Sequence, residues 1–360
     1  MRVLLAAALA AVLCAGTAGC SGSGRDGGGG ASAQAAASSR EISFGVDGTT
    51  TYGTLQVPVH HSGQRLPAAL ILAGSGPTDR DGDQNGQGTH NLKLIAGVLD
   101  KMGISTLRFD KYFAGRTGFG KYQGHPGTID LNAFIQQADD AYKFLCQQST
   151  TDTGRLLVVG HSEGGMYAML VAETVSPHPV GLALLEPQDE RFLDNLDVQI
   201  NEMLDAAVGQ GTLGSDAARQ QALLVKQAIA QFRAGQPVVT TGILQGIVTL
   251  LDTLIVNPDN ALYDKTADEV YPPQVAAKLP GAPRVLVTDG TADTKVPNFT
   301  IQPLVDALRQ ASITGPGLVT LDSVDHDLHP PGSGANDQVL APAFISALQD
   351  WGRPYASTSS

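Results

Sequence analysis

The residues from Gly160 to Gly164 form a Gly-x-Ser-x-Gly motif with Ser162 at its centre. An apolar run typical of a buried strand precedes the motif, and small and apolar residues at helical spacing follow it. In this context the strand-to-helix turn presents the serine hydroxyl clear of the backbone and beside a helix N-terminus. A serine hydroxyl becomes an effective nucleophile only when a neighbouring base takes its proton. The motif therefore predicts Ser162 as a catalytic nucleophile, although a glycine-rich turn with an incidental serine would contain the same five residues.

Candidate bases follow a later strand-like run. His326 and His329 lie directly after the last such run of the chain. Active residues of open parallel sheets gather at the carboxyl ends of the strands, where Ser162 also lies. We predict His326 as the base, with His329 as its rival, since a histidine at this edge can accept the Ser162 proton.

Several carboxylates could orient that histidine. Asp289 and Asp293 follow the strand-like run before it, and Glu186 ends the run after the helix that follows Ser162. A carboxylate behind the base fixes its tautomer and stabilises the imidazolium. Asp110 also follows a strand end, but we expect it to brace the site together with Arg108 and to take no part in the chemistry.

Strand-like runs alternate with helical patterns along most of the chain, which indicates a parallel sheet covered on both faces. From 187 to 281 this alternation stops and only helical patterns remain. We therefore predict an α/β fold, with a mostly parallel eight-stranded sheet, helices on both faces and a helical cap inserted after the sixth strand. The core comprises 41–186 and 282–352, the cap comprises 187–281, and 353–360 form a disordered tail.

The N-terminal segment is typical of an export signal. Residues 1–19 carry one positive charge and an apolar stretch too short to span a bilayer, and Cys20 follows directly. This order is similar to a bacterial lipoprotein signal, which predicts a lipid anchor on Cys20 and a place in the cell envelope. The Gly, Ala and Ser residues that dominate 20–40 predict a disordered tether. The alternative is an ordinary secretory signal and a secreted soluble protein. A net charge of −12 argues against nucleic acid as a partner.

Four motifs in order resemble the α/β-hydrolase superfamily. They are Gly74-Ser75-Gly76-Pro77-x-Asp79-Arg80-Asp81, Arg108-Phe109-Asp110-Lys111, Gly160-His161-Ser162-Glu163-Gly164-Gly165 and Gly290-x-x-Asp293-x-x-Val296-Pro297. Within this superfamily the chain looks like bacterial esterase-like proteins related to acyl-CoA thioesterases and to the C-terminal domain of bile-acid-CoA acyltransferases. The chain departs from their pattern at 111–116, where they have a shorter loop rich in arginine and glycine.

The resemblance implies roles for further residues. It favours Asp293 over Asp289 and Glu186 as the acid of a Ser-Asp-His triad. It implies an oxyanion hole formed by the backbone N–H groups of Ser75 and Glu163, and it implies no cofactor and no metal. The stretch 81–86 imitates the first half of a calcium loop, but an apolar residue stands where such a loop needs a bidentate glutamate, so we expect a polar surface loop there.

These features predict a serine hydrolase that cleaves a small-molecule carboxylic ester, or a thioester, through an acyl-enzyme. Acyl-CoA is scarce outside the cytoplasm, which favours the carboxylic ester. Two alternatives remain. One is a peptidase of the serine aminopeptidase type, which shares this fold and triad. The other is a non-catalytic binding lipoprotein on the same scaffold.

Overall fold

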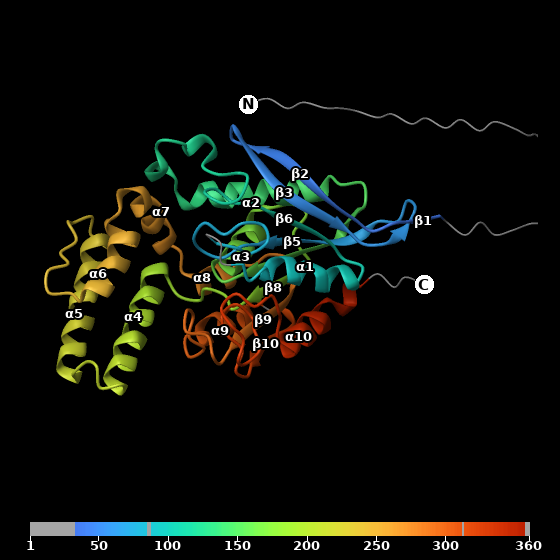
Figure 1. The fold of residues 1–360 in the computed structure, drawn as a ribbon. Coiled ribbons are helices and arrows are strands. Elements are labelled where there is room, and N and C mark those ends of the chain that lie inside the picture. Colours follow the sequence, from blue (N-terminus) through green and yellow to red (C-terminus); the bar gives the residue numbers. More distant parts are fainter. Residues whose placement is uncertain (1–32, 85–87, 312, 357–360) are drawn as a thin grey trace, which may run out of the picture. The chain divides into compact units, whose positions relative to one another are not determined.

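The structure, a computed structural model, describes residues 33–84, 88–311 and 313–356 (Figure 1). The predicted signal segment, Cys20 and most of the predicted tether lie outside the described residues, as do the last residues of the predicted tail. The end of the segment predicted as a disordered tether forms strands. Strand β1 (Gln34–Ala35) pairs with β4 (His60–His61), and β2 (Ser38–Val46) begins within the tether segment. The hairpin turn at Asp47 sets a register that continues the β2–β3 ladder back to Ser38.

The central sheet has eight strands in the order β10-β9-β8-β7-β5-β6-β3-β2. Besides β2 they are β3 (Thr49–Val57), β5 (Leu66–Leu72), β6 (Ser105–Phe109), β7 (Thr151–His161), β8 (Gly181–Leu185), β9 (Arg284–Gly290) and β10 (Thr314–Leu321). All neighbouring pairs are parallel except β2–β3 and β3–β6. Every residue of β5, β6 and β8 is buried, as expected for strands covered on both faces. The predicted fold class is confirmed.

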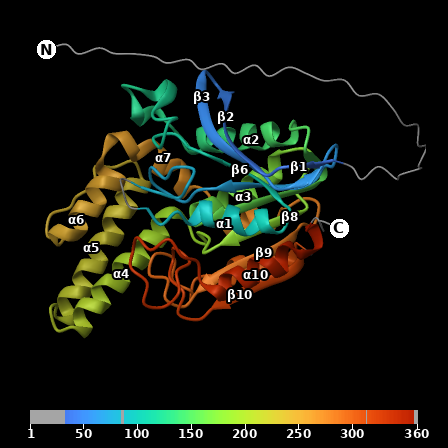
Figure 2. The ribbon, with the colours of Figure 1, turned by 45° about the vertical axis from the view of Figure 1, so that its right-hand side comes forward.

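Helices cover the two faces of the sheet and enclose two apolar clusters (Figure 2). On one face lie α1 (Asn91–Lys101) and α10 (Pro342–Gly352), and the short helix η4 (Arg353–Tyr355) continues α10 into the segment predicted as tail. On the other face lie α2 (Leu131–Cys146), α3 (Glu163–Thr174), α8 (Pro272–Ala276) and α9 (Gln302–Gln310). Helix α8 belongs to the segment predicted as cap, yet it packs into the core beside α9 and α3.

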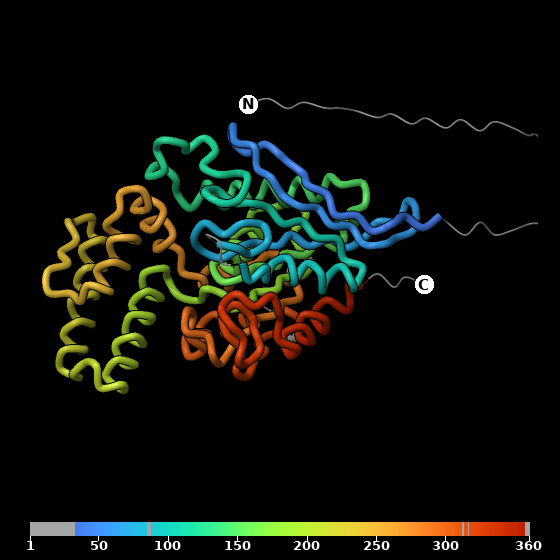
Figure 3. The backbone as a smooth tube through the Cα atoms, viewed as in Figure 1, coloured from blue at the N-terminus to red at the C-terminus, as the bar shows by residue number. Residues whose placement is uncertain are grey.

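The cap leaves the core after β8 and returns before β9 (Figure 3). It contains α4 (Phe192–Gly209), α5 (Ser215–Arg233), α6 (Gln245–Leu251), the π-helix η3 (Asp252–Val256) and α7 (Pro258–Asp268). Helices α4, α5, α6 and η3 bury their apolar stripes against one another in a separate cluster. Within the described ranges, no helix combines the length and apolar character needed to cross a membrane.

Candidate active site

Ser162 lies at the turn between β7 and α3 with backbone angles φ 57° and ψ −126°. These angles are strained for a residue with a side chain, and such strain is typical of a nucleophile turn. Close backbone approach requires the two motif glycines. A Cβ on Gly160 would lie 1.9 Å from the Gly164 carbonyl oxygen, and a Cβ on Gly164 would lie 2.4 Å from the Leu72 carbonyl oxygen. The sequence pattern therefore corresponds to a tight turn that only glycine at these two positions permits.

Asp293 and His326 form a buried pair at the carboxyl ends of β9 and β10. The Asp293 Oδ2 atom lies 2.6 Å from His326 Nδ1. The other carboxylate oxygen, Oδ1, accepts backbone N–H groups from Lys295 at 2.7 Å and Val296 at 2.9 Å. One oxygen thus holds the carboxylate in place while the other orients the ring. The Nε2 atom of His326 is left as the position where a proton can be taken up or released.

His326 is in contact with the residue that precedes Ser162. The His161 Nε2 atom lies 2.7 Å from the His326 carbonyl oxygen, and the two ring centres are 5.0 Å apart. Burial and the neighbouring His326 lower the pKa of His161 to about 4, so the His161 ring is neutral near pH 7 and donates its Nε2–H to that carbonyl. The Ser162 hydroxyl makes no hydrogen bond to a described residue. Such bonds often tighten only when substrate binds.

The rival residues are engaged elsewhere. His329 Nδ1 lies 3.1 Å from Asp325 Oδ2, so this histidine has its own carboxylate partner. Asp289 lies in β9 itself, and burial together with the neighbouring Asp293 raises its pKa to about 7. Glu186 Oε2 accepts the Gly290 backbone N–H at 2.6 Å. Of the three candidate acids, Asp293, Asp289 and Glu186, only Asp293 is hydrogen-bonded to His326.

Glu186 is a buried acid whose surroundings favour its protonated form. Burial raises the pKa of its carboxyl group well above the usual range, the Gly290 N–H opposes this shift, and the carboxylates of Asp293 and Asp289 add to it. Its second oxygen, Oε1, is buried and has no hydrogen-bond partner among the described residues. A raised pKa favours the protonated form, which is a poorer partner for an imidazolium or a substrate ammonium group than a carboxylate.

The loop that carries Ser75 runs beside Ser162. A Cβ on Gly74 would lie 2.9 Å from the Ser162 Cβ and 3.5 Å from its Oγ. The Ser75 carbonyl accepts hydrogen bonds from Thr78 Oγ1 at 2.9 Å and Gln84 Nε2 at 2.7 Å, which keep the loop folded over the turn. Glu163 is the first residue of α3, and its backbone N–H is one of the donors that a helix leaves without an internal partner.

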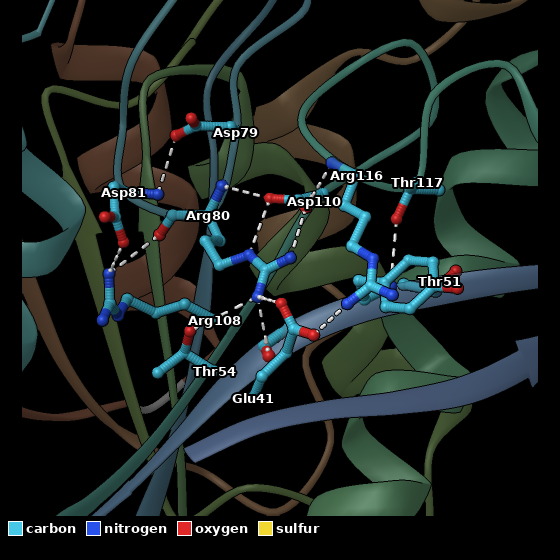
Figure 4. Close-up of polar contacts among 12 residues, drawn as sticks. Glu41, Thr51, Thr54, Asp79, Arg80, Asp81, Arg108, Asp110, Arg116 and Thr117 are labelled. Carbon is cyan, nitrogen blue, oxygen red and sulfur yellow. Dashed lines mark hydrogen bonds and ion pairs between the residues drawn. The ribbon is translucent and has the colours of Figure 1, made fainter. Parts of the chain in front are cut away.

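Asp110 and Arg108 both hold the 79–83 loop, but they do so through different partners and do not pair with each other. Figure 4 shows that the Asp110 carboxylate is occupied by Arg80, which donates Nε to Oδ1 at 2.9 Å and Nη2 to Oδ2 at 2.6 Å. Arg108 instead reaches the Asp81 carboxylate and the Arg80 carbonyl. The planar fork of Arg80 matches both oxygens of Asp110. Asp110 therefore anchors the 79–83 loop to the end of β6.

No group of His, Cys, Asp and Glu side chains within 33–84, 88–311 and 313–356 has the arrangement to hold a metal ion. Asn85 and Gly86, the last two residues of the calcium-like stretch, lie outside the described residues.

The profile of the alpha/beta hydrolase family matches residues 102–341, two thirds of the chain. The chain belongs to the alpha/beta hydrolase family. Among solved structures, this hydrolase is similar to Est1E from Butyrivibrio proteoclasticus with bound ferulic acid, with 17% identity, a TM-score of 0.54, and coverage of 87% of this chain and 98% of that chain. It is also similar to an esterase of Pyrococcus furiosus, with 12% identity, a TM-score of 0.55, and coverage of 89% and 92%. At these identities the likeness shows the fold. No curated protein matches the sequence.

The hydrolase also contains a buried polar network that the sequence did not predict. Lys111 Nζ donates to the Gly74 carbonyl and lies 3.9 Å from Glu163 Oε2. The Glu163 carboxylate accepts the hydroxyl of Tyr263 from cap helix α7, and that hydroxyl lies 2.7 Å from the Tyr167 hydroxyl. Lys111 belongs to the motif Arg108-Phe109-Asp110-Lys111, so its position beside the site could have been expected from the sequence. No sequence feature pointed to Tyr263, because its segment shows only helical spacing.

Proposed function

We propose that this alpha/beta hydrolase is a serine hydrolase that cleaves carboxylic esters through an acyl-enzyme. The observation that carries the proposal is the buried pair of Asp293 and His326, with 2.6 Å between Oδ2 and Nδ1, in a loop that contacts the Ser162 turn through His161. The pair gives a base whose tautomer is fixed, next to a serine in a strained turn.

The steps follow from these positions. His326 Nε2 accepts the Ser162 proton as Oγ attacks the ester carbonyl carbon. The carbonyl oxygen becomes an oxyanion, which the backbone N–H groups of Ser75 and Glu163 stabilise. The imidazolium then gives its proton to the departing alcohol, and the acyl group remains on Ser162. A water molecule attacks the acyl-enzyme with His326 as base, and Ser162 leaves as the free hydroxyl.

Several arguments favour an ester over the alternatives. One of the similar solved structures is described as an esterase, and another has ferulic acid bound. A peptidase of the aminopeptidase type needs a carboxylate for the substrate ammonium group. Glu186, the candidate for that role, is buried and hydrogen-bonded to Gly290. A thioester of coenzyme A is disfavoured by the export signal expected at 1–19. The geometry of Asp293 and His326 disfavours a purely binding function, because a binder has no use for a buried tautomer-fixing pair.

The test is hydrolysis of p-nitrophenyl acetate by wild type and by Ser162→Ala. We expect the variant to lose at least about 10⁴-fold in kcat/KM and to keep its thermal midpoint, since the side chain shortens by one atom. Ser346→Ala on the exposed surface of α10 is the matched control and should remain fully active. A fluorophosphonate probe should label wild type and Ser346→Ala only. Turnover or labelling of Ser162→Ala would refute the assignment, and a dipeptide amide cleaved faster than aryl esters would favour the peptidase.

We also propose that the protein is exported and attached to the membrane of the cell envelope through lipid on Cys20. This rests on the order of charge, apolar stretch and cysteine in the first twenty residues.

A further inference from the structure

Lys111 is a buried lysine directly beneath the loop that carries the proposed oxyanion donor. Its side chain is 8% exposed, and its ammonium lies 5.8 Å from the centre of the Phe134 ring. Burial lowers the pKa of Lys111, and the Glu163 carboxylate opposes that shift. An ammonium group in such a place is costly to desolvate. The contacts that it makes therefore indicate its role.

The hydrogen bond of Lys111 goes to the loop and not to the carboxylate. Nζ donates to the Gly74 carbonyl oxygen, whereas the nearest Glu163 oxygen is 3.9 Å away, beyond hydrogen-bond distance. Glu163 therefore balances the charge of Lys111 from a distance. The carboxylate is itself held by the Tyr263 hydroxyl, so the cap helix α7 contacts the same network. The hydrogen bond from the Lys111 ammonium is made to one peptide group.

That peptide group joins Gly74 to Ser75. In a trans peptide the C=O and N–H bonds point in opposite directions, so a donor that holds the carbonyl from below also fixes where the N–H points. Gly74 is packed against Ser162, with 2.9 Å between its ideal Cβ position and the Ser162 Cβ. A cation on the carbonyl also polarises the peptide and strengthens its N–H as a donor.

We infer that Lys111 is a positioning residue for the oxyanion hole: its ammonium group holds the Gly74–Ser75 peptide so that the Ser75 N–H faces the reacting carbonyl. This inference rests on the proposed ester hydrolysis at Ser162. It assigns to the lysine a function in the transition state, because the oxyanion develops only there.

The test compares three variants with wild type on p-nitrophenyl acetate. Lys111→Met keeps the length of the side chain and removes the charge and the hydrogen bond, and we expect kcat to fall about 10- to 100-fold with KM changed less than about threefold. Lys143→Met makes the same change to an exposed lysine on α2 and is the matched control, and we expect its kcat within about threefold of wild type. The double variant Lys111→Met with Glu163→Gln leaves no unbalanced buried charge. We expect its thermal midpoint to recover relative to Lys111→Met while kcat stays low.

The double variant separates positioning from stability. If kcat recovers together with the thermal midpoint, Lys111 has only a structural role and the inference is overturned. A folded Lys111→Met with kcat within twofold of wild type overturns it as well. Fluorophosphonate labelling of Ser162 in the wild type keeps the two proposals apart: labelling with wild-type turnover supports the ester hydrolysis whatever Lys111 does. Absence of both removes the proposed function, and the inference falls with it.

Discussion

The substitution Asp293→Asn tests the proposed acid most directly. Asp293 Oδ1 accepts two backbone N–H groups, and Oδ2 lies 2.6 Å from His326 Nδ1. An asparagine can keep its oxygen on the two backbone donors only if its NH₂ group faces the imidazole. That NH₂ donates, so His326 Nδ1 must accept and the ring proton must sit on Nε2. A protonated Nε2 cannot take the Ser162 proton.

The size of the effect follows from this tautomer change. Holding the base in the wrong tautomer costs about 10⁴-fold in kcat, or about 5 kcal/mol of transition-state stabilisation. The fold should be spared, because both backbone hydrogen bonds of Oδ1 have an equivalent in the amide. We expect a thermal midpoint within about 3 °C of wild type.

The assay is steady-state hydrolysis of p-nitrophenyl acetate at pH 8, with Glu186→Gln as the matched control. Burial raises the pKa of the Glu186 carboxyl and so favours its protonated form, and a glutamine oxygen can accept the Gly290 N–H in the same way. We therefore expect Glu186→Gln to stay within about threefold of wild-type kcat. A loss below tenfold for Asp293→Asn, or a larger loss for Glu186→Gln, would show that the reasoning about the acid is wrong.

Three further predictions concern stability and location. Burial, with Glu163 and another carboxylate nearby, raises the pKa of Asp264 in α7 to about 8, so the stability that this group contributes is complete below about pH 4 and is lost as pH rises toward 8. The free energy of unfolding of Asp264→Asn, relative to that of wild type, should therefore rise by about 1 kcal/mol or more between pH 5 and pH 8, measured by urea titration. A difference between the two proteins that does not change with pH would contradict this. Gly160→Ala would place a methyl group 1.9 Å from the backbone of α3 and should cost about 3 kcal/mol or more, whereas Gly97→Ala in α1, where nothing lies within 4 Å, should stabilise by up to about 1 kcal/mol, with thermal midpoints as the measurement. Finally, Cys20→Ser should move the protein from the membrane fraction to the soluble fraction of cells, and unchanged membrane association would count against lipidation at that position.

Much of the fold could be predicted from the sequence because the signals are local. Strands such as β5 and β7 are continuous apolar runs, and a strand buried on both faces needs such a run wherever the rest of the chain lies. The order of elements then places the loops after β7, β9 and β10 at one edge of the sheet. This is why Ser162, Asp293 and His326 could be selected before their distances were known.

For elements with weaker local signals, the predicted bounds or domain assignment differ from the structure. The ladder between β2 and β3 continues to Ser38, because strand pairing is set by the partner strand and not by the Ala and Ser residues that carry it. The sequence of helix α8 has the same helical spacing as the cap helices, and only its contacts with α9 and α3 assign it to the core. In both places the deciding contact is made with a residue far away in the sequence.

The same reason separates what the sequence determined about the site from what only the tertiary structure decided. The proposed nucleophile and base follow from residue type and position at strand ends, and the motif Gly290-x-x-Asp293-x-x-Val296-Pro297 selects Asp293 as the proposed acid. Which arginine holds Asp110, and which group Lys111 binds, depend on residues separated by 30 and 37 positions along the chain. Arg80 and Arg108 are chemically alike, and only the path of the 79–83 loop brings one fork onto Asp110 and the other onto Asp81. Residue type sets which contacts are possible, and the packing of distant segments sets which of them form.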